Sequence, residues 1–518
     1  MELIKKNIHM NRQQCRSEAV LSLSDDINVP DIKPDVSAVI KIAGEFIIEE
    51  QKAVNGRLYI RGAFKYQLLY VSDDQTKPIN GMNGQISFDE AVYSDNALNG
   101  ENVHVRLVTD DISCLVINSR KLSVKAKIRA YISLEELYDE ESIADVKDEA
   151  DIQLLKKELT VTNITVSKKD ACRFKEEITL PASKGTISEL LYAQADLKNI
   201  DIRLLNDKFS AKGEVAVFIV YSCAGEDNPF EYYEADIPFV QIIDCEGIDE
   251  NMIPNISVVL NNKSFNVKTD GDGEERIIET EAVADYNIKI YNEESFDVVK
   301  DMYSPVKPVI PQMKEAVYEN LLLKNSNKVR ITDKIKIAPD APKVLQICHA
   351  GGTVNIENVR IKDEGLAAEG YVEAGIFYIS ADDDRPLYTV KQKIPFIQEV
   401  DVKGITQDNI YEIEAAVEQV NVIMLDADEM ETKVSVVLNV VVFDRINEKF
   451  VCGVETAEKV KTNLRRLPLM TGYIVSGGET LWDIAKAHST TIEEIRQMNQ
   501  IEGEEIKAGD RLLIVRKV

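Results

Sequence analysis

Apolar and polar residues alternate along three separate segments of the chain, at residues 58–70, 209–221 and 366–378. Successive side chains of a β-strand point to opposite faces of a sheet, so alternation over this length predicts a strand with one face on a core. An acidic or polar stretch containing a proline follows each segment, which predicts hairpin loops. These prolines are Pro78, Pro229 and Pro386.

The three segments share landmarks in register, which indicates an internal repeat. A glycine precedes a tyrosine by eight residues in each of them, at Gly62 and Tyr70, Gly213 and Tyr221, and Gly370 and Tyr378. A phenylalanine follows each glycine by twenty-six residues, at Phe88, Phe239 and Phe396. A unit of about 150 residues is long enough to hold its own core. The repeat therefore predicts domains at residues 1–151, 152–309 and 310–457.

Each landmark glycine falls on the inward phase of its strand, where the missing side chain predicts a bulge, a bend or a close approach of another backbone. Runs of β-branched residues later in the units, such as 122–128 and 433–443, predict further strands. The expected fold is mainly β, with three repeated β-sandwich-like domains. Short helices are expected at residues 188–197 and 312–324, where apolar residues recur at spacings of three and four.

The pattern changes after Cys452. A charged stretch broken by a proline predicts a linker at residues 458–470, and a compact unit follows at residues 471–518. Two expected helix starts in this unit carry the capping-box spacing, in which a hydroxyl and a carboxylate satisfy free backbone N–H groups. They are Thr480 with Asp483, and Thr491 with Glu494. We expect a small α+β domain with two helices between two strands (βααβ).

Residues 473–514 of this unit resemble the LysM module. The resemblance implies recognition of N-acetylglucosamine polymers, peptidoglycan or chitin, in a shallow groove between two loops. Carried over by position, the groove would comprise Gly478, Glu479, Thr480, Leu481, Asn499, Gln500 and Ile501. The structural core of the module would comprise Tyr473, Val475, Trp482, Ile484 and Ile514. Glu479 stands where the family usually has aspartate, so the charge is kept on a longer side chain.

Two residues of this unit have a structural interpretation beside the functional one. Trp482, the only tryptophan of the chain, is expected to anchor the small core rather than to stack on a sugar ring. Asn499 is expected to satisfy backbone groups at the end of the second helix rather than to contact a ligand. The sequence therefore predicts the module itself but does not identify its ligand.

The charge of the chain excludes one class of partner. Lys and Arg number 61 against 89 Asp and Glu, which gives a net charge of −28. The field of such a protein repels phosphate backbones and anionic lipids, so nucleic acid is not an expected partner. The longest apolar run, residues 434–443, is too short to span a bilayer, and the N-terminus has no signal-peptide pattern. We expect a cytoplasmic protein without membrane insertion.

Candidate chemistry is sparse in the sequence. The seven cysteines show no CxxC spacing, and the GxxxxGK[ST], HExxH and GxSxG motifs do not occur. Cys348 and His349 are adjacent, but neighbours on a strand point to opposite faces. The acidic stretch from Asp270 has Glu275 where a calcium loop needs glycine, so a solvated hairpin tip is expected there. The expected protein is not an enzyme, with no catalytic residues, no cofactor and no metal.

Three β-rich repeats followed by a LysM module resemble the SPOCS-domain spore coat proteins of spore-forming Firmicutes, most closely their clostridial SipL type. The resemblance implies a mother-cell protein at the forespore surface and spore coat that binds the morphogenetic ATPase SpoIVA, with LysM as an interaction module. Repeated domains present repeated surfaces, so weak contacts add through effective concentration. We therefore expect a non-catalytic scaffold of coat morphogenesis.

Two other hypotheses stay open at this point. A cell-wall or cortex protein would bind N-acetylglucosamine-containing glycan directly, and substitution of Gly478 or Thr480 would abolish its retention on peptidoglycan. A wall hydrolase targeted by its LysM module would need glycan cleavage by the repeats. Paired carboxylates are common in so acidic a chain, and nothing singles out a catalytic pair among them.

Overall fold

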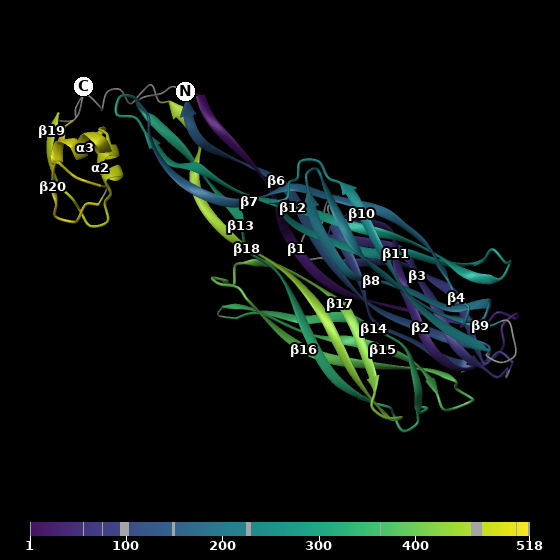
Figure 1. The fold of residues 1–518 in the computed structure, drawn as a ribbon. Coiled ribbons are helices and arrows are strands. Elements are labelled where there is room, and N and C mark those ends of the chain that lie inside the picture. Colours follow the sequence, from purple (N-terminus) through teal and green to yellow (C-terminus); the bar gives the residue numbers. More distant parts are fainter. Residues whose placement is uncertain are drawn as a thin grey trace.

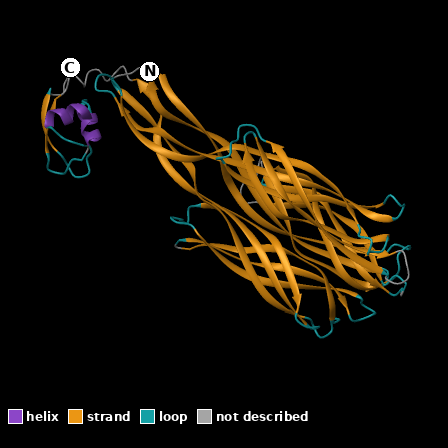
Figure 2. Ribbon diagram, viewed as in Figure 1, coloured by secondary structure: helices purple, strands orange, loops and turns teal. Residues whose placement is uncertain are grey.

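The structure is a computed structural model that describes residues 2–54, 56–74, 76–93, 103–147, 151–223, 229–362, 364–456, 469–503 and 505–515. Long strands form an elongated body, and a small module with two short helices lies at one end of it (Figure 1 and Figure 2). Residues 458–468 of the predicted linker and residues 224–228 of the second hairpin loop lie outside the described residues. No helix in the described part of the chain is long and apolar enough to cross a membrane.

In the part of the chain that the structure describes, each repeat consists of six strands. The first repeat has β1 (Glu2–Asn28), β2 (Val36–Val54), β3 (Arg57–Ser72), β4 (Ile79–Tyr93), β5 (Val103–Asn118) and β6 (Lys121–Lys147). The second has β7 (Gln153–Thr179), β8 (Ile187–Leu205), β9 (Lys208–Cys223), β10 (Phe230–Asp244), β11 (Ile253–Thr269) and β12 (Glu275–Tyr303). The third has β13 (Val309–Lys336), β14 (Val344–Lys362), β15 (Gly365–Ser380), β16 (Leu387–Asp401), β17 (Ile410–Met424) and β18 (Glu429–Thr456).

The six strands of each repeat form two three-stranded antiparallel sheets. In the first repeat the orders are β2-β3-β4 and β1-β6-β5, and the other two repeats follow the same scheme. In β3, side chains of the predicted inward phase, including Leu58, Phe64 and Tyr70, have no exposed surface. They lie in one apolar cluster with Leu122 and Ile128 of the facing sheet. The prediction of a mainly antiparallel β fold is confirmed.

The landmark glycines lie where backbones approach closely. Gly62 pairs with Ile48 of β2, and the register shifts through a bulge directly after that residue. A Cβ atom at position 62 would collide with the carbonyl oxygen of Ile47. Phe88 pairs with Gly62 from the other side, and its ring covers the glycine. Gly213 with Phe239 and Gly370 with Phe396 repeat the arrangement, which explains why glycine and phenylalanine recur together.

The landmark tyrosines of the first and third repeats hold the loop between the first two strands of their repeat. The hydroxyl of Tyr70 donates to the carbonyl oxygen of Pro34 at 3.2 Å, and that of Tyr378 donates to Pro342 at 2.8 Å. In the second repeat, Tyr221 instead donates to the Glu231 carboxylate at 3.0 Å. Burial raises the pKa of Tyr70 to about 12, so this hydroxyl keeps its proton at neutral pH.

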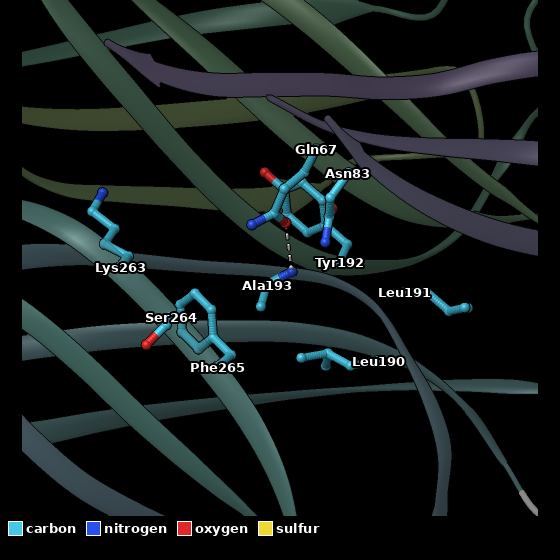
Figure 3. A pocket seen from close by; sticks show the side chains of 9 residues that line it. All are labelled: Gln67, Asn83, Leu190, Leu191, Tyr192, Ala193, Lys263, Ser264 and Phe265. Carbon is cyan, nitrogen blue, oxygen red and sulfur yellow. Dashed lines mark hydrogen bonds between the residues drawn. The ribbon is translucent and has the colours of Figure 1, made fainter. Parts of the chain in front are cut away.

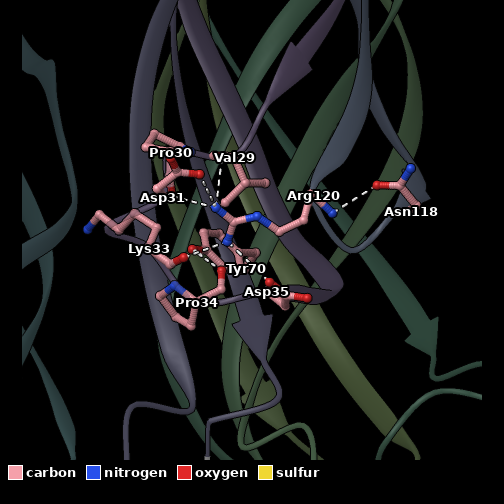
Figure 4. A network of polar contacts seen from close by, with 9 residues as sticks. All are labelled: Val29, Pro30, Asp31, Lys33, Pro34, Asp35, Tyr70, Asn118 and Arg120. Carbon is pink, nitrogen blue, oxygen red and sulfur yellow. Dashed lines mark hydrogen bonds and ion pairs between the residues drawn. The ribbon is translucent and has the colours of Figure 1, made fainter.

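Arg120 fixes the same loop of the first repeat from the β5–β6 hairpin (Figure 4). Its guanidinium group donates to the carbonyl oxygens of Val29, Pro30 and Lys33 at 2.7–3.1 Å, and it also contacts the Asp35 carboxylate at 3.1 Å. The rigid fork of arginine suits several acceptors at once. The loop is therefore held from both sides, by Tyr70 and by Arg120.

Two predicted helices are wrong. Residues 188–197 belong to strand β8, and residues 312–324 belong to strand β13. Both stretches contain β-bulges, for example next to Leu190 and next to Leu321. A bulge inserts one extra residue and shifts the period-two alternation, so inward apolar residues become three apart as on a helix. Pairing with β9 in the first case and with β18 in the second decides the structure here.

The long first and last strands of the three repeats converge toward the end of the body at which the N-terminus lies (Figure 1). Lysines of the first strands form ion pairs across the repeats in cyclic order. The pairs are Lys6 with Glu294, Lys157 with Glu448, and Lys314 with Glu140. Apolar residues of all three repeats, among them Ile8, Val161 and Tyr318, fill the space between these strands. We refer to these converging strands as the stalk.

A second junction joins the three repeats at their β2, β8 and β14 sheets. Its apolar cluster comprises Ile40, Leu69, Val71, Ile79, Leu191, Tyr192, Phe218, Val220, Cys348, Phe377 and Leu387. Phe218 packs against Phe377 with ring centroids 5.1 Å apart, and Tyr192 packs against Phe377 at 5.5 Å. Every repeat thus contacts both others, and the three repeats form one interlocked body rather than a linear array of separate domains.

Candidate ligand-binding site

The C-terminal module has the expected order of elements. Strand β19 (Met470–Ile474) is followed by helices α2 (Leu481–His488) and α3 (Ile492–Asn499) and by strand β20 (Arg511–Val515), which pairs antiparallel with β19. The predicted core residues Val475, Trp482, Ile484 and Ile514 lie in one buried cluster, against which Tyr473 packs. The small core therefore fixes both helices on the two-stranded sheet.

Both helices begin with complete capping boxes. The Thr480 hydroxyl accepts from the backbone N–H of Asp483, and the Asp483 carboxylate accepts from the N–H of Thr480. Thr491 and Glu494 do the same for α3. The hydrogen bonds from Thr480 hold the pKa of Asp483 below its usual value. Local sequence alone sets the start of each helix, so the expectation from the spacing is confirmed.

The loop between β19 and α2 carries one side of the expected groove. Gly478 has φ +88°, a backbone conformation that favours glycine, and the Thr480 side chain is exposed. The Glu479 carboxylate accepts from the Tyr473 hydroxyl at 2.7 Å and from the Ser476 N–H at 2.8 Å. These bonds lower the pKa of Glu479. The longer glutamate side chain therefore folds back onto its own loop and stabilises it.

The segment at the end of α3 carries the other side. The Asn499 side chain donates to the carbonyl oxygens of Ile495 and Leu513, both at 2.8 Å, and accepts from the Leu513 N–H. Its amide is engaged with backbone groups and ties α3 to β20. Gln500 ends the helix with φ +56° and is exposed. Ile501 packs against the core cluster that contains Leu481, so both loops are attached to the same core.

Trp482 has a contact that sequence analysis missed. Only 7% of its surface is exposed, and its indole N–H donates to a carboxylate oxygen of Asp301 in β12 at 2.9 Å. The ring is thus a core residue of the module and also contacts the second repeat. The lone aspartate at the end of β12 gave no signal in the sequence, because its partner lies far along the chain. The groove residues themselves stay a prediction.

Comparison with protein families identifies the domains. The model described as the SPOCS domain of SipL matches residues 35–117, 186–268 and 343–425, one match in each repeat. The LysM domain model matches residues 473–515. The chain therefore carries three SPOCS domains and a C-terminal LysM domain. No curated protein and no solved structure matches it.

The LysM match supports binding of N-acetylglucosamine-containing glycans, and the exposed groove positions lie within the matched residues. The SPOCS matches cover the second to fifth strands of each repeat, whereas the stalk strands lie mainly outside them. The cyclic ion pairs of the stalk therefore lie in the part of each repeat that the family model does not cover.

The other residues considered for catalysis or metal binding make structural contacts. Burial raises the pKa of the Cys348 thiol to about 12, which disfavours the reactive thiolate. His349 stacks on Phe218 with ring centroids 4.2 Å apart, and its Nδ1 contacts the Glu234 carboxylate. The Asp270 carboxylate accepts from backbone N–H groups of its own loop, as a hairpin tip does. Within the described ranges no group of three or more His, Cys, Asp or Glu could hold a metal.

A crevice of about 260 Å³ lies between the first and second SPOCS domains (Figure 3). Gln67 and Asn83 line it from the first domain, and residues 190–193 and 263–265 line it from the second. The Gln67 side chain accepts from the Ala193 N–H at 3.1 Å and so bridges the two domains. The crevice is part of the packing between domains, and Lys263 is the one charged residue among the described residues that line it.

Proposed function

We propose that this chain is a non-catalytic scaffold of spore coat morphogenesis that binds the coat ATPase SpoIVA and helps to localise coat at the forespore surface in the mother cell. The observation that supports it most is the joining of three SPOCS domains into one interlocked body with a LysM domain docked at its end. A rigid body with several faces suits a protein that holds others in place.

In this proposal, each SPOCS domain comprises all six strands of its repeat. The stalk strands pair within their own repeat, β1 with β6, β7 with β12 and β13 with β18. This supports the boundaries 1–151, 152–309 and 310–457, followed by the linker and the LysM domain.

The net charge of this chain indicates which sign of charge the contact surface of its partner carries. The net charge of −28 attracts cationic surfaces and repels anionic ones at long range. The proposed contact face of the partner is therefore basic, and its binding weakens as ionic strength rises.

A second candidate function is direct binding of peptidoglycan. Gly478, Thr480 and Gln500 are exposed at the expected groove, so a glycan chain has access to them. Under this alternative the protein is a cell-wall or cortex protein, and the LysM domain carries the binding.

A paired binding experiment separates the two functions. The full chain, a chain that ends at Pro468 and the full-length Gln500→Gly variant are tested for SpoIVA capture from sporulating cells and for retention on purified peptidoglycan. Glycine at position 500 keeps the positive φ without strain and removes an exposed side chain. SpoIVA capture by the full chain without glycan retention supports the scaffold. Glycan retention that Gln500→Gly weakens, with no SpoIVA captured, supports the alternative.

A further inference from the structure

The Asp301 carboxylate, at the end of β12, contacts the LysM domain. Asp301 accepts from the Trp482 indole N–H at 2.9 Å and from the Lys486 ammonium group at 2.6 Å and 2.7 Å. Trp482 and Lys486 are four residues apart on α2 and share one helix face. A single side chain of the second SPOCS domain thus contacts two successive turns of the helix.

Tyr303 extends this contact into the LysM core. Its hydroxyl donates to the carbonyl oxygen of Thr490 at 2.8 Å, and its ring meets Trp482 edge-on with centroids 4.9 Å apart. Tyr303 belongs to the same buried cluster as Val475 and Ile495 of the module. Burial raises the pKa of Tyr303 well above the usual range, so the hydroxyl remains a donor. A residue of the second SPOCS domain therefore completes the LysM core.

A β-bulge directs these side chains outward. Val299 and Met302 both lie in the stalk core although they are an odd number of residues apart, because the register shifts between Val299 and Asp301. Asp301 and Tyr303 consequently share the opposite face of β12, toward the LysM domain. The bulge in β12 thus places the side chains of Asp301 and Tyr303 on the same face, toward the LysM domain.

The other two domains carry the same bulge without the same side chains. The register shift lies between Ile143 and Asp145 in the first domain and between Val451 and Gly453 in the third. The positions that correspond to Asp301 and Tyr303 are Asp145 and Lys147 in the first domain, and Gly453 and Glu455 in the third. Neither combines an acceptor with an aromatic ring, so the LysM domain has one matching site among three similar ones.

We propose that Asp301 and Tyr303 form a dedicated docking site for the LysM domain of this chain, which holds the domain in one orientation on the stalk. Docking occupies the Trp482 and Lys486 face of α2 and leaves the exposed groove positions Thr480 and Gln500 free for a ligand. The orientation of the groove is then set by this contact rather than by the linker. The inference goes beyond the proposed function, because it holds whether the LysM domain binds glycan or protein.

Trp482 is the only tryptophan, so its fluorescence in the full chain reports on docking directly. Asp301→Lys places a cation against Lys486 and removes the acceptor of the indole N–H, and Tyr303→Ala removes the covering ring. Both variants should shift the emission to longer wavelength and increase quenching by acrylamide. Asp297→Lys makes the same charge change at an exposed position on the same strand and should leave the emission unchanged.

A charge exchange distinguishes loss of docking from loss of folding. Lys486→Asp should also shift the emission, and the Asp301→Lys/Lys486→Asp double variant should recover part of the parent emission, because the ion pair is restored with its charges reversed. Unchanged emission in both Asp301→Lys and Tyr303→Ala would overturn the proposal. A double variant with no recovery over the single ones would overturn it as well.

Discussion

The LysM helices and the SPOCS strands depend on contacts at very different distances along the chain. Helices α2 and α3 begin at threonines whose capping partners lie three residues away. In the SPOCS body, by contrast, Glu2 pairs with Lys147, and the cyclic ion pair of Lys6 reaches Glu294. Damage to the LysM domain should therefore stay local, whereas damage to the SPOCS junction should affect all three domains.

The largest effect is expected at the junction of the three domains. Phe218→Ala removes a ring with 1% exposure that packs against residues of the second and third domains, and should cost about 3 to 5 kcal/mol of unfolding free energy. Denaturation followed by far-UV circular dichroism should show one transition for the whole SPOCS body at lower denaturant concentration. Ile242→Ala, at a position with 61% exposure in the same sheet, is the matched control. A midpoint equal to that of the control would show that the junction does not couple the domains.

Gly62 in the SPOCS body and Gly472 in the LysM domain should differ in how well each position tolerates an added Cβ atom. Gly62→Ala forces a Cβ atom into the carbonyl oxygen of Ile47 and should destabilise the SPOCS body by about 2 to 3 kcal/mol. Gly472→Ala in β19 meets no atom within 4 Å and should stay within about 0.5 kcal/mol of the parent. Thermal unfolding of both variants tests the pair. Equal effects would remove the explanation given for the recurring glycine.

Lys41 provides a pH-dependent test of the junction, because its ammonium group lies 5.7 Å from the ring centroid of Phe377. Burial, and then the nearby Lys391, lower its pKa to about 8. The unfolded chain keeps this lysine protonated up to about pH 10. Between pH 8 and 10 the unfolded state therefore binds more protons than the folded state. The contribution of Lys41 to the free energy of unfolding rises with pH in this range. Lys41→Met should stabilise the body by about 1 to 2 kcal/mol at pH 7, and the difference should shrink toward pH 10. Urea unfolding at both pH values measures it, and a constant difference would contradict the assignment.

The smallest effect is expected in the LysM domain. Thr480→Ala removes the N-cap of α2 and should cost about 1 kcal/mol. Trp482 emission should report earlier unfolding of the module, while circular dichroism of the strands stays at the parent midpoint. Thr480→Ser keeps the capping hydroxyl and serves as the control. A simultaneous shift of the strand signal would show that the module stabilises the SPOCS body.

The two wrong helices show where sequence analysis reaches its limit. Spacings of three and four at residues 188–197 and 312–324 are typical of a helix, but they also arise when a bulge shifts the phase of a strand. Only the pairing strand distinguishes the two, and it lies outside the stretch in which the spacing is read: it is β9 for residues 188–197 and β18 for residues 312–324. The capping boxes of Thr480 and Thr491 involve near neighbours and were predicted correctly.

The sequence by itself determined the three β repeats, the glycine and tyrosine landmarks and the LysM helices, because period-two alternation, recurring spacing and capping depend on residues close in the chain. The tertiary structure decided the bulges opposite Gly62 and Gly370, the burial of β3 on both faces and the docking of Trp482 on Asp301. The reason is physical: a bulge depends on the strand that pairs with it, and the contact of Trp482 with Asp301 joins segments more than a hundred residues apart. Neither feature leaves a periodic pattern in one segment, because its side chains become neighbours only in the folded chain.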